Sequence, residues 1–210
     1  MIEMAVLVVG STGRVAKEVL KIFSAEKTEV LAAARRPEAV EKLPYVTAVA
    51  LDLHAPVDKL AKEIQGVEAI IFAAGSRGKD LLQTDAYGAV KLMQAAQQVG
   101  IKRFVMLSAL YSLKPEKWPE TLTDYYIAKF FADNYLINQN KLDYTIVQPG
   151  SLVTTPGTGL VKMAEEPGQI SIADVAAVLA TVVNKVATYG RIIPVVAGNQ
   201  PIATALQEIE

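Results

Sequence analysis

Short apolar runs alternate with longer helical stretches along most of this sequence. The run Ala5-Val6-Leu7-Val8-Val9 is too short for a helix and rich in valine, which is typical of a buried strand. Apolar residues then recur on one helical face from Arg14 to Ser24. Buried strands separated by helices are typical of parallel strands with right-handed crossovers, so the pattern predicts a doubly wound α/β fold.

The same alternation continues to the end of the sequence. Further strands are expected at 29–34, 47–53, 69–73, 104–108, 144–147 and 191–197, and further helices at 80–99, 122–138, 171–184 and 202–209. Residues 154–168 lack an apolar period and are expected to form a flap, while Ser171 and Asp174 predict a capping box. We therefore expect one Rossmann-type domain over 1–210, with a mostly parallel sheet of about seven strands. Residues 151–210 would supply the flap on the substrate side and the closing elements.

Composition narrows the possible functions. With 21 basic and 22 acidic residues, the net charge of -1 argues against a nucleic-acid or anionic-membrane partner. There is no cysteine and a single histidine, His54, so thiolate catalysis is excluded and no metal site is expected. No long apolar run or signal peptide is present, so we expect a soluble, cytoplasmic monomer or homodimer that acts on a small molecule.

A glycine-containing loop separates the first strand from the first helix. A dinucleotide pyrophosphate needs unobstructed backbone N–H groups beside a helix N-terminus. The spacing here is G-x-x-G-x-x-A rather than G-x-G-x-x-G, and strand-to-helix turns also use glycine for steric reasons alone. Its place at the start of a full alternating pattern nevertheless predicts a dinucleotide site. The expected cofactor-binding residues of this loop are Gly10, Ser11, Thr12, Gly13, Arg14 and Val15.

The second strand ends in Arg35-Arg36, where an NAD site would place a carboxylate. Two guanidinium groups suit a 2′-phosphate, so NADP is favoured over NAD; solvated arginines are the alternative. Asp52, at the end of the third strand, could accept from the adenine amino group or simply be a turn residue. The remaining cofactor-side candidates at strand ends are Leu53, Ala73, Ala74 and Gly75.

Several segments in order resemble a known family: GSTGRVA, AAARRP, LDL, FAAGS, TDAYGA, KRFVMLS, YYIAK, DYTIVQPGSL and a late DVA. Together they resemble the atypical short-chain dehydrogenase/reductases, specifically small NAD(P)-binding proteins described as NmrA-like or sugar-epimerase-like. The resemblance covers nearly the whole chain and implies a Rossmann fold and an NADP site. Positions matching the family's nucleotide contacts are Gly10, Gly13, Arg14, Arg35, Asp52, Ala74 and Gly75; relatives also place backbone at Pro149 and Gly150 against the nicotinamide amide.

Tyr125 and Lys129 are four residues apart and therefore share one helical face. An adjacent ammonium would lower the tyrosine pKa for acid/base work, and the lysine could also hold the nicotinamide ribose. In the resembled superfamily Y-x-x-x-K carries these roles, with a serine or threonine after the fifth strand. An ordinary half-buried helix face is the alternative. Ser108 is the candidate hydroxyl, but Ala109 follows where relatives have a second one, and Ser108 could merely cap the strand end.

These features favour an NADP(H)-binding oxidoreductase that acts on a small carbonyl, quinone or flavin-like acceptor. Two other classes stay open: a non-catalytic NADP-binding sensor of the NmrA-like kind, and a nucleotide-sugar epimerase or dehydratase. Many relatives have arginine before the proline of the sixth strand, whereas this sequence has Gln148, which indicates a less anionic substrate.

Overall fold

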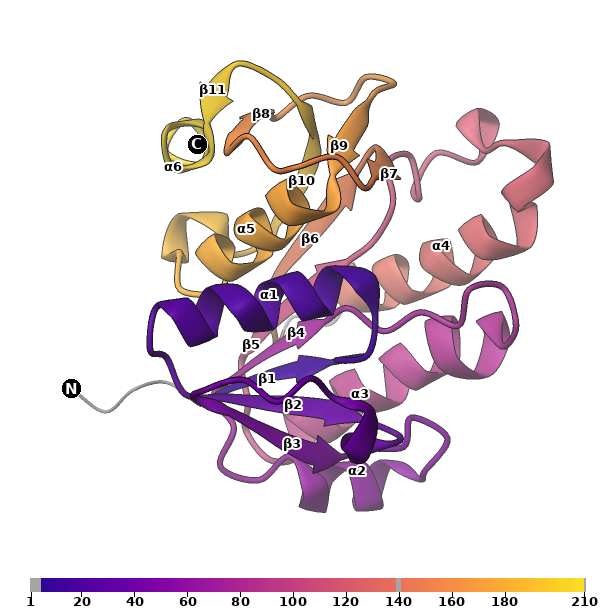
Figure 1. The fold of residues 1–210 in the computed structure, drawn as a ribbon. Coiled ribbons are helices and arrows are strands. Elements are labelled where there is room, and N and C mark those ends of the chain that lie inside the picture. Colours follow the sequence, from indigo (N-terminus) through magenta and orange to yellow (C-terminus); the bar gives the residue numbers. More distant parts are fainter. Residues whose placement is uncertain (1–4, 139–140, 210) are drawn as a thin grey trace.

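A nine-stranded sheet forms the centre of the molecule in the computed structural model, which describes residues 5–138 and 141–209 (Figure 1). Its strands are β1 (Val6–Val9), β2 (Val30–Ala34), β3 (Val46–Ala50), β4 (Ala69–Phe72), β5 (Arg103–Leu107), β6 (Asp143–Pro149), β8 (Leu160–Lys162), β10 (Arg191–Ala197) and β11 (Gln200–Pro201). The order is β11-β8-β10-β6-β5-β4-β1-β2-β3.

The seven strands from β10 to β3 are parallel, and β8 and β11 extend this sheet in antiparallel pairing. The predicted fold class is therefore confirmed, but the expected number of about seven strands covers only the parallel part. The central strands β1 and β4 are buried along their whole length, as expected for valine- and isoleucine-rich strands with both faces covered.

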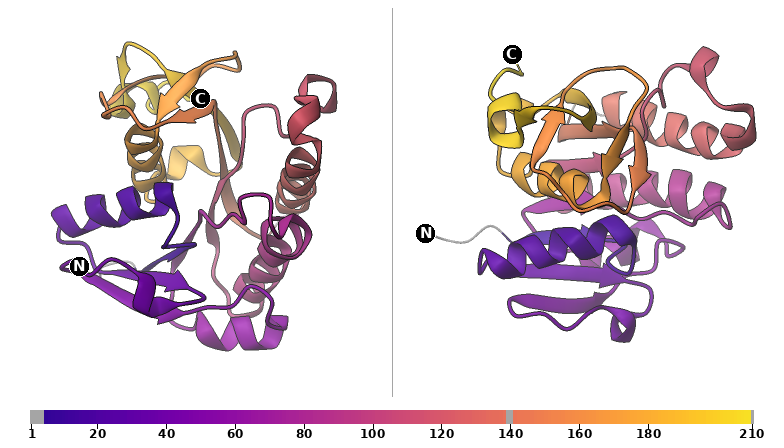
Figure 2. Two further views of the ribbon diagram at one scale, coloured as in Figure 1. Left: turned by 45° about the vertical axis from the view of Figure 1, so that its right-hand side comes forward. Right: turned by 45° about the horizontal axis from the view of Figure 1, so that its top comes forward.

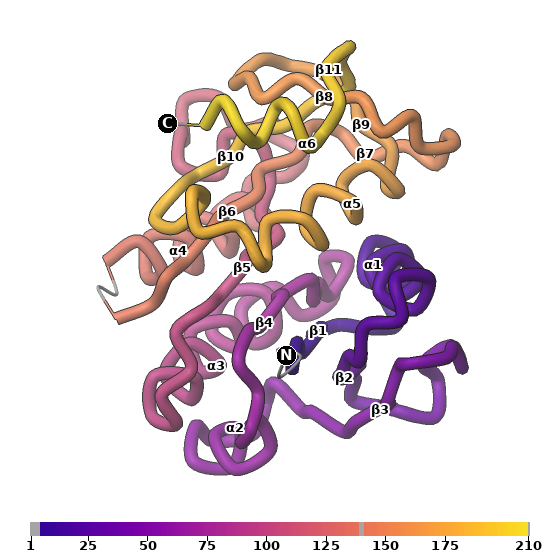
Figure 3. Tube along the Cα trace, turned by 90° about the vertical axis from the view of Figure 1, so that its left-hand side faces the viewer, coloured from indigo at the N-terminus to yellow at the C-terminus, as the bar shows by residue number. Residues whose placement is uncertain are grey.

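Helices cover both faces of the sheet (Figures 2 and 3). They are α1 (Arg14–Ala25), α2 (Val57–Glu63), α3 (Tyr87–Gln98), α4 (Thr123–Asn138), α5 (Ile172–Val182) and α6 (Ile202–Ala205). α1 packs on α5 on one face, while α2, α3 and α4 form the layer on the other. Each layer encloses its own apolar core, one around Phe23 and Val175 and the other around Phe72 and Leu92. Within the described ranges, no helix is both long and apolar enough to cross a bilayer.

Several boundaries differ from expectation. The helix expected at 80–99 begins as a π-helical turn, η2 (Leu81–Ala86), before α3. α2 was not anticipated, and the expected closing helix at 202–209 is limited to α6. The flap contains β8 and is flanked by β7 (Ser151–Val153) and β9 (Gln169–Ser171). The strands β7 and β9 pair with each other. Figure 2 shows these segments at one end of the molecule, together with α6.

The expected capping box at α5 forms only in half. The hydroxyl of Ser171 accepts from the backbone N–H of Ala173 at 3.2 Å, as an N-cap does. The carboxylate of Asp174 instead accepts from the N–H groups of Thr158 (3.0 Å) and Gly159 (2.7 Å). Asp174 therefore anchors the flap to the first turn of α5.

Candidate nucleotide and acceptor site

The strand order reverses at β1, because the chain builds β2 and β3 on one side of it and β4, β5 and β6 on the other. In doubly wound sheets ligands bind at such a switch point, at the carboxyl ends of the strands. Gly10 after β1 and Ala74 after β4 meet there: a Cβ atom added to Gly10 would lie 2.5 Å from the Cα of Ala74. Gly10 also has φ +85°, so both the turn and the close approach require glycine.

Gly13 leaves the start of α1 bare. It is the N-cap residue, with φ -76° and no side-chain cap, and a Cβ atom here would lie 3.0 Å from the carbonyl oxygen of Gly10. The N–H groups of Gly10 and Ser11 are used by the carbonyl of Ala33, both at 3.1 Å. The donors left for an anion are therefore the N–H of Thr12 in the loop and the first N–H groups of the helix, at Arg14 and Val15. This corner fits a pyrophosphate.

The side chains of the loop divide into two groups. The hydroxyl of Ser11 is buried and donates to the carbonyl of Val8 at 2.8 Å, so it stabilises the loop from within. Val15 is also buried, and its contribution to a ligand is limited to its backbone. Thr12 and Arg14 are exposed beside the loop.

Arg35 and Arg36 are exposed directly after β2. The pKa of Asp80 is lowered mainly by a hydrogen bond from Thr84 and by His54. The positive charge of Arg35 lowers it further, to a lesser degree. His54 Nε2 lies 2.6 Å from the Asp80 carboxylate. The Asp80 carboxylate is therefore hydrogen-bonded to His54 and Thr84, and it lies near Arg35.

Asp52 and Leu53 shape the turn after β3. One carboxylate oxygen of Asp52 accepts from the N–H of His54 at 3.0 Å, so Asp52 contributes to the turn. Its contact with the adenine amino group stays a prediction. Leu53 is buried against α3, where a Cβ atom on Gly88 would lie 3.1 Å from the Leu53 Cβ. Gly88 allows this contact because it has no side chain.

The end of β4 is closed by Asp85 of η2. Ala74 is buried and Ala73 half-buried, while Gly75 is exposed. Asp85 accepts from the N–H of Ser76 at 2.9 Å, and a Cβ atom on Gly75 would lie 3.4 Å from the same carboxylate. The π-helical turn thus brings a buried carboxylate to the switch point.

Tyr125 and Lys129 lie on the inner side of α4, with Lys129 Nζ 5.8 Å from the centroid of the Tyr125 ring. Lys129 is buried, which lowers its pKa, and its ammonium donates to the carbonyl of Leu107 at 3.0 Å. Burial, followed by the charges of Asp85 and Asp133, raises the pKa of Tyr125. The expectation that Lys129 lowers the tyrosine pKa is therefore wrong.

Ser108 belongs to a buried polar cluster made of Ser108, Ser112, Asp133 and Gln148. The hydroxyls of Ser108 and Ser112 both donate to Asp133 Oδ2, at 2.5 and 2.6 Å. Gln148 Nε2 donates to the Ser112 hydroxyl at 2.8 Å. Burial raises the pKa of Asp133 to about 6, against the opposing effect of the two serine hydrogen bonds. Its other oxygen, Oδ1, is buried without a partner among the described residues.

Asp133 was not predicted from the sequence as a site residue. It lies four residues after Lys129 and eight after Tyr125, and therefore on the same face of α4. The spacing of this carboxylate from Lys129, on one face of a helix, could have indicated that Asp133 belongs to the site.

The backbone at Pro149 and Gly150 is used by the protein itself. The Pro149 carbonyl accepts from the N–H of Leu110, and the Gly150 N–H donates to the carbonyl of Val195, both at 2.9 Å. A Cβ atom on Gly150 would lie 2.4 Å from the carbonyl oxygen of Gly168. These two residues therefore join β6 to its neighbours and to the flap.

Comparison with known proteins agrees with this geometry. Residues 10–185 match the family described as NAD(P)H-binding. The oxidoreductase ylbE from Lactococcus lactis has a crystal structure with a TM-score of 0.94 and 44% identity, over 97% of this chain and 95% of that one. A Bacillus halodurans structure, described as a candidate NAD-dependent epimerase/dehydratase, has a TM-score of 0.88 and 33% identity over 98% and 99% of the two chains.

A curated relative gives the same result. YhfK of Bacillus subtilis, named as an uncharacterized sugar epimerase, is 35% identical over 215 residues, which cover 98% of this chain and all of that protein. The resemblance to atypical short-chain dehydrogenase/reductases is thereby confirmed. The chain, with its bare glycine loop at the switch point of the sheet, belongs to the NAD(P)H-binding family.

Proposed function

We propose that this protein is an NADP(H)-dependent oxidoreductase that reduces a small carbonyl, quinone or flavin-like acceptor in the cytoplasm, as a monomer or homodimer. The observation that carries the proposal is the bare N-terminus of α1, flanked by two exposed arginines at the end of β2. The family description and the oxidoreductase name of the similar Lactococcus lactis protein support it. When bound, the nicotinamide supplies the hydride.

The choice of NADP rests on charge. Arg35 and Arg36 present two guanidinium groups, each able to make paired, charge-assisted hydrogen bonds to a phosphate. A carboxylate at this position would instead accept from the ribose hydroxyl of NAD and repel a 2′-phosphate.

The proton for the reduced acceptor is assigned to Tyr125. Its raised pKa keeps the phenol protonated at neutral pH, and its hydroxyl donates to no described residue. Ser108 cannot serve in the same way, because its proton is committed to Asp133. Lys129 stays at the carbonyl of Leu107 and contributes its charge to this corner.

The test of cofactor choice is a set of NADPH and NADH titrations on the parent, Arg35→Ala and Arg36→Ala. Each lost charge-assisted bond contributes on the order of 1.5–3 kcal/mol, so NADPH binding should weaken by roughly ten- to a hundredfold. NADH binding should barely change. Arg191→Ala, an exposed arginine at the start of β10, is the matched control. Equal losses for both cofactors, or a parent that prefers NADH, would contradict the assignment.

A non-catalytic NADP-binding sensor is the second candidate, favoured by the commitment of the Ser108 hydroxyl to Asp133. The two functions separate in an assay of NADPH absorbance with a panel of carbonyl, quinone and flavin acceptors. Oxidation of NADPH with any of them supports the oxidoreductase. Tight NADPH binding without oxidation by the whole panel supports the sensor.

A further inference from the structure

A pocket of about 340 Å³ opens beside β6 and β10, at the carboxyl end of β6. The register of these strands places Gln148 beside Pro194 and Ile146 beside Ile192. Gln148, Ile192 and Pro194 line the pocket from the sheet, and Tyr111 and Leu113 line it from the segment after β5. The volume lies in the lower part of the range of small-molecule pockets.

The charges that line this pocket cancel. Lys114 and Glu165 form an ion pair with Nζ 2.6 Å from Oε2. The other lining side chains are apolar or aromatic, except for Gln148. A pocket of this kind favours a neutral, mainly apolar ring over a multiply charged ligand, because no unpaired lining charge is available to replace water around an ionic group.

The wall formed by Tyr111 is held in place. Tyr111 has φ +66°, a left-handed conformation that is costly for a bulky residue and persists only when its surroundings fix it. Its carbonyl accepts from Trp118 Nε1 at 2.9 Å, and Lys117 Nζ lies 4.5 Å from the centroid of its ring. Its hydroxyl donates to the carbonyl of Glu165 at 3.4 Å. The pocket is therefore shaped before a ligand arrives.

The buried cluster determines which end of the Gln148 amide faces the pocket. An ionised Asp133 only accepts, so the Ser112 hydroxyl gives its proton to Asp133 and can then only accept from Gln148. The NH₂ group of Gln148 must therefore point to Ser112. The carbonyl oxygen, Oε1, has no hydrogen-bond partner among the described residues, and the residue lines the pocket.

We propose that this pocket binds the acceptor and that Gln148 Oε1 accepts a hydrogen bond from a ring N–H of it. The substrate class is then a neutral, planar heterocycle with an imide or lactam N–H, such as a flavin ring, rather than a quinone, which has no such donor. This inference rests on the proposed oxidoreductase function, because it identifies where the acceptor of that reaction binds. Gln148 is a specificity-determining residue, and Ser112 and Asp133 position it.

Binding of lumiflavin and of N3-methyllumiflavin tests the proposal. The two probes differ only in the ring N–H, and quenching of flavin fluorescence reports their binding without turnover. We expect the parent to bind lumiflavin roughly tenfold more tightly, the effect of one neutral hydrogen bond. In Gln148→Met the two affinities should become equal, whereas Gln65→Met, an exposed glutamine before β4, should behave as the parent.

Ser112→Ala tests the positioning. Without the serine oxygen the NH₂ group of Gln148 is held only by Asp133, whose pKa it lowers, so the amide is less firmly oriented. The preference for lumiflavin should therefore shrink while Gln148 is still present. Equal affinities in the parent, binding of neither probe, or a preference that survives Gln148→Met would overturn the proposal. A parent that binds the probes as expected but never oxidises NADPH would overturn the oxidoreductase function, while recognition of the ring N–H by Gln148 would stand.

Discussion

Tyr125 and Lys129 show how burial can reverse an expectation based on spacing. The two residues share a helical face, yet burial raises the tyrosine pKa and lowers that of the lysine. Asp85 and Asp133 place negative charge around both groups, which further disfavours a tyrosinate. Tyr125 is therefore suited to donating a proton, and a reduction that leaves an oxyanion on the acceptor needs such a donor.

Tyr125→Phe should slow NADPH-dependent reduction by roughly 10²–10⁴-fold, the usual contribution of a positioned acid. NADPH affinity should be nearly unchanged, because the hydroxyl acts on the acceptor. The parent rate should show no loss attributable to tyrosine ionisation from about pH 7 to 9, since the raised pKa keeps the phenol neutral. NADPH absorbance at a series of pH values gives both results. A Phe variant with the parent rate would show that reduction proceeds without this acid.

At the residue scale, the loop glycines and the strand-end positions could be predicted from the sequence. Gly10 and Gly13 follow a valine-rich strand and precede an amphipathic helix, and both features are local. The contacts of Ser108 with Asp133 and of Ser112 with Gln148 could not be predicted. They join residues 25 and 36 positions apart, and they depend on how α4 packs on β5 and β6.

Among the secondary-structure elements, α5 has a buried arginine, Arg103, at its C-terminus. Arg103, at the start of β5, donates to the carbonyls of Val182 (2.5 Å) and Val183 (2.9 Å) and lies 4.4 Å from the centroid of the Tyr189 ring. It also donates to the carbonyl of Asp143 at 2.7 Å. Burial lowers the pKa of Arg103 to about 10, so it stays charged at neutral pH beside the negative end of the helix.

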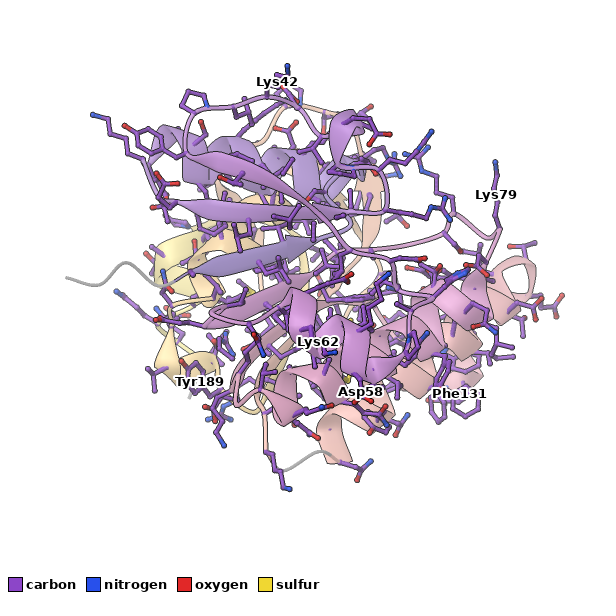
Figure 4. The ribbon with its side chains drawn as sticks, turned by 90° about the horizontal axis from the view of Figure 1, so that it is seen from below. Lys42, Asp58, Lys62, Lys79, Phe131 and Tyr189 are labelled. Carbon is purple, nitrogen blue, oxygen red and sulfur yellow. The ribbon has the colours of Figure 1, made fainter. Side chains whose placement is uncertain are left out.

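Arg103→Met should lower the free energy of unfolding by about 3 kcal/mol, because it leaves several buried carbonyls without a donor. NADPH affinity of the folded variant should be retained: Figure 4 shows Tyr189, which stacks on Arg103, and Lys79, which follows β4, at opposite ends of the molecule. Urea denaturation followed by circular dichroism measures the loss. Arg191→Met removes an exposed arginine and should change stability little. A similar loss of unfolding free energy in both variants would show that Arg103 does not stabilise the C-terminus of α5.

Elements with a clear apolar pattern of their own were predictable, and elements without one were not. The twelve residues of α1 carry a clear helical period, and the four residues of β1 are recognisable as a continuous valine-rich run. The strands β8 and β11 have three and two residues, too few to show any alternation, and each is formed only by pairing with another segment. The seven residues of α2 lie in the gap between two expected strands and were overlooked for the same reason.

For the molecule as a whole, Asp133 makes stability depend on pH. Burial raises its pKa from the ordinary 3.8 to about 6. Because the folded state holds this proton more tightly than the unfolded state, the stability that protonation contributes is complete below about pH 4. It is lost as the pH rises through about 6.

Asp133→Asn cannot titrate at this position. The difference in unfolding free energy, parent minus variant, should therefore fall by about 2.4 kcal/mol between pH 4 and pH 7. Urea denaturation of both proteins across this range measures it. Asp58→Asn, at an exposed position of α2 (Figure 4), serves as the control for replacing a carboxylate by an amide at the surface. A constant difference for Asp133→Asn, or one that grows with pH, would contradict the raised pKa.

The packing of α1 on α5 has a consequence for the order in which the chain can fold during its synthesis. α1 presents buried Val19, Leu20 and Phe23, and its partner α5 lies roughly 150 residues further along. At about 5–20 residues per second, a ribosome needs on the order of ten to thirty seconds to make that stretch. Throughout this interval the apolar stripe of α1 can be covered only in part, by the first strands of the sheet. Until α5 leaves the ribosome, the N-terminal half therefore exposes apolar surface to which chaperones can bind.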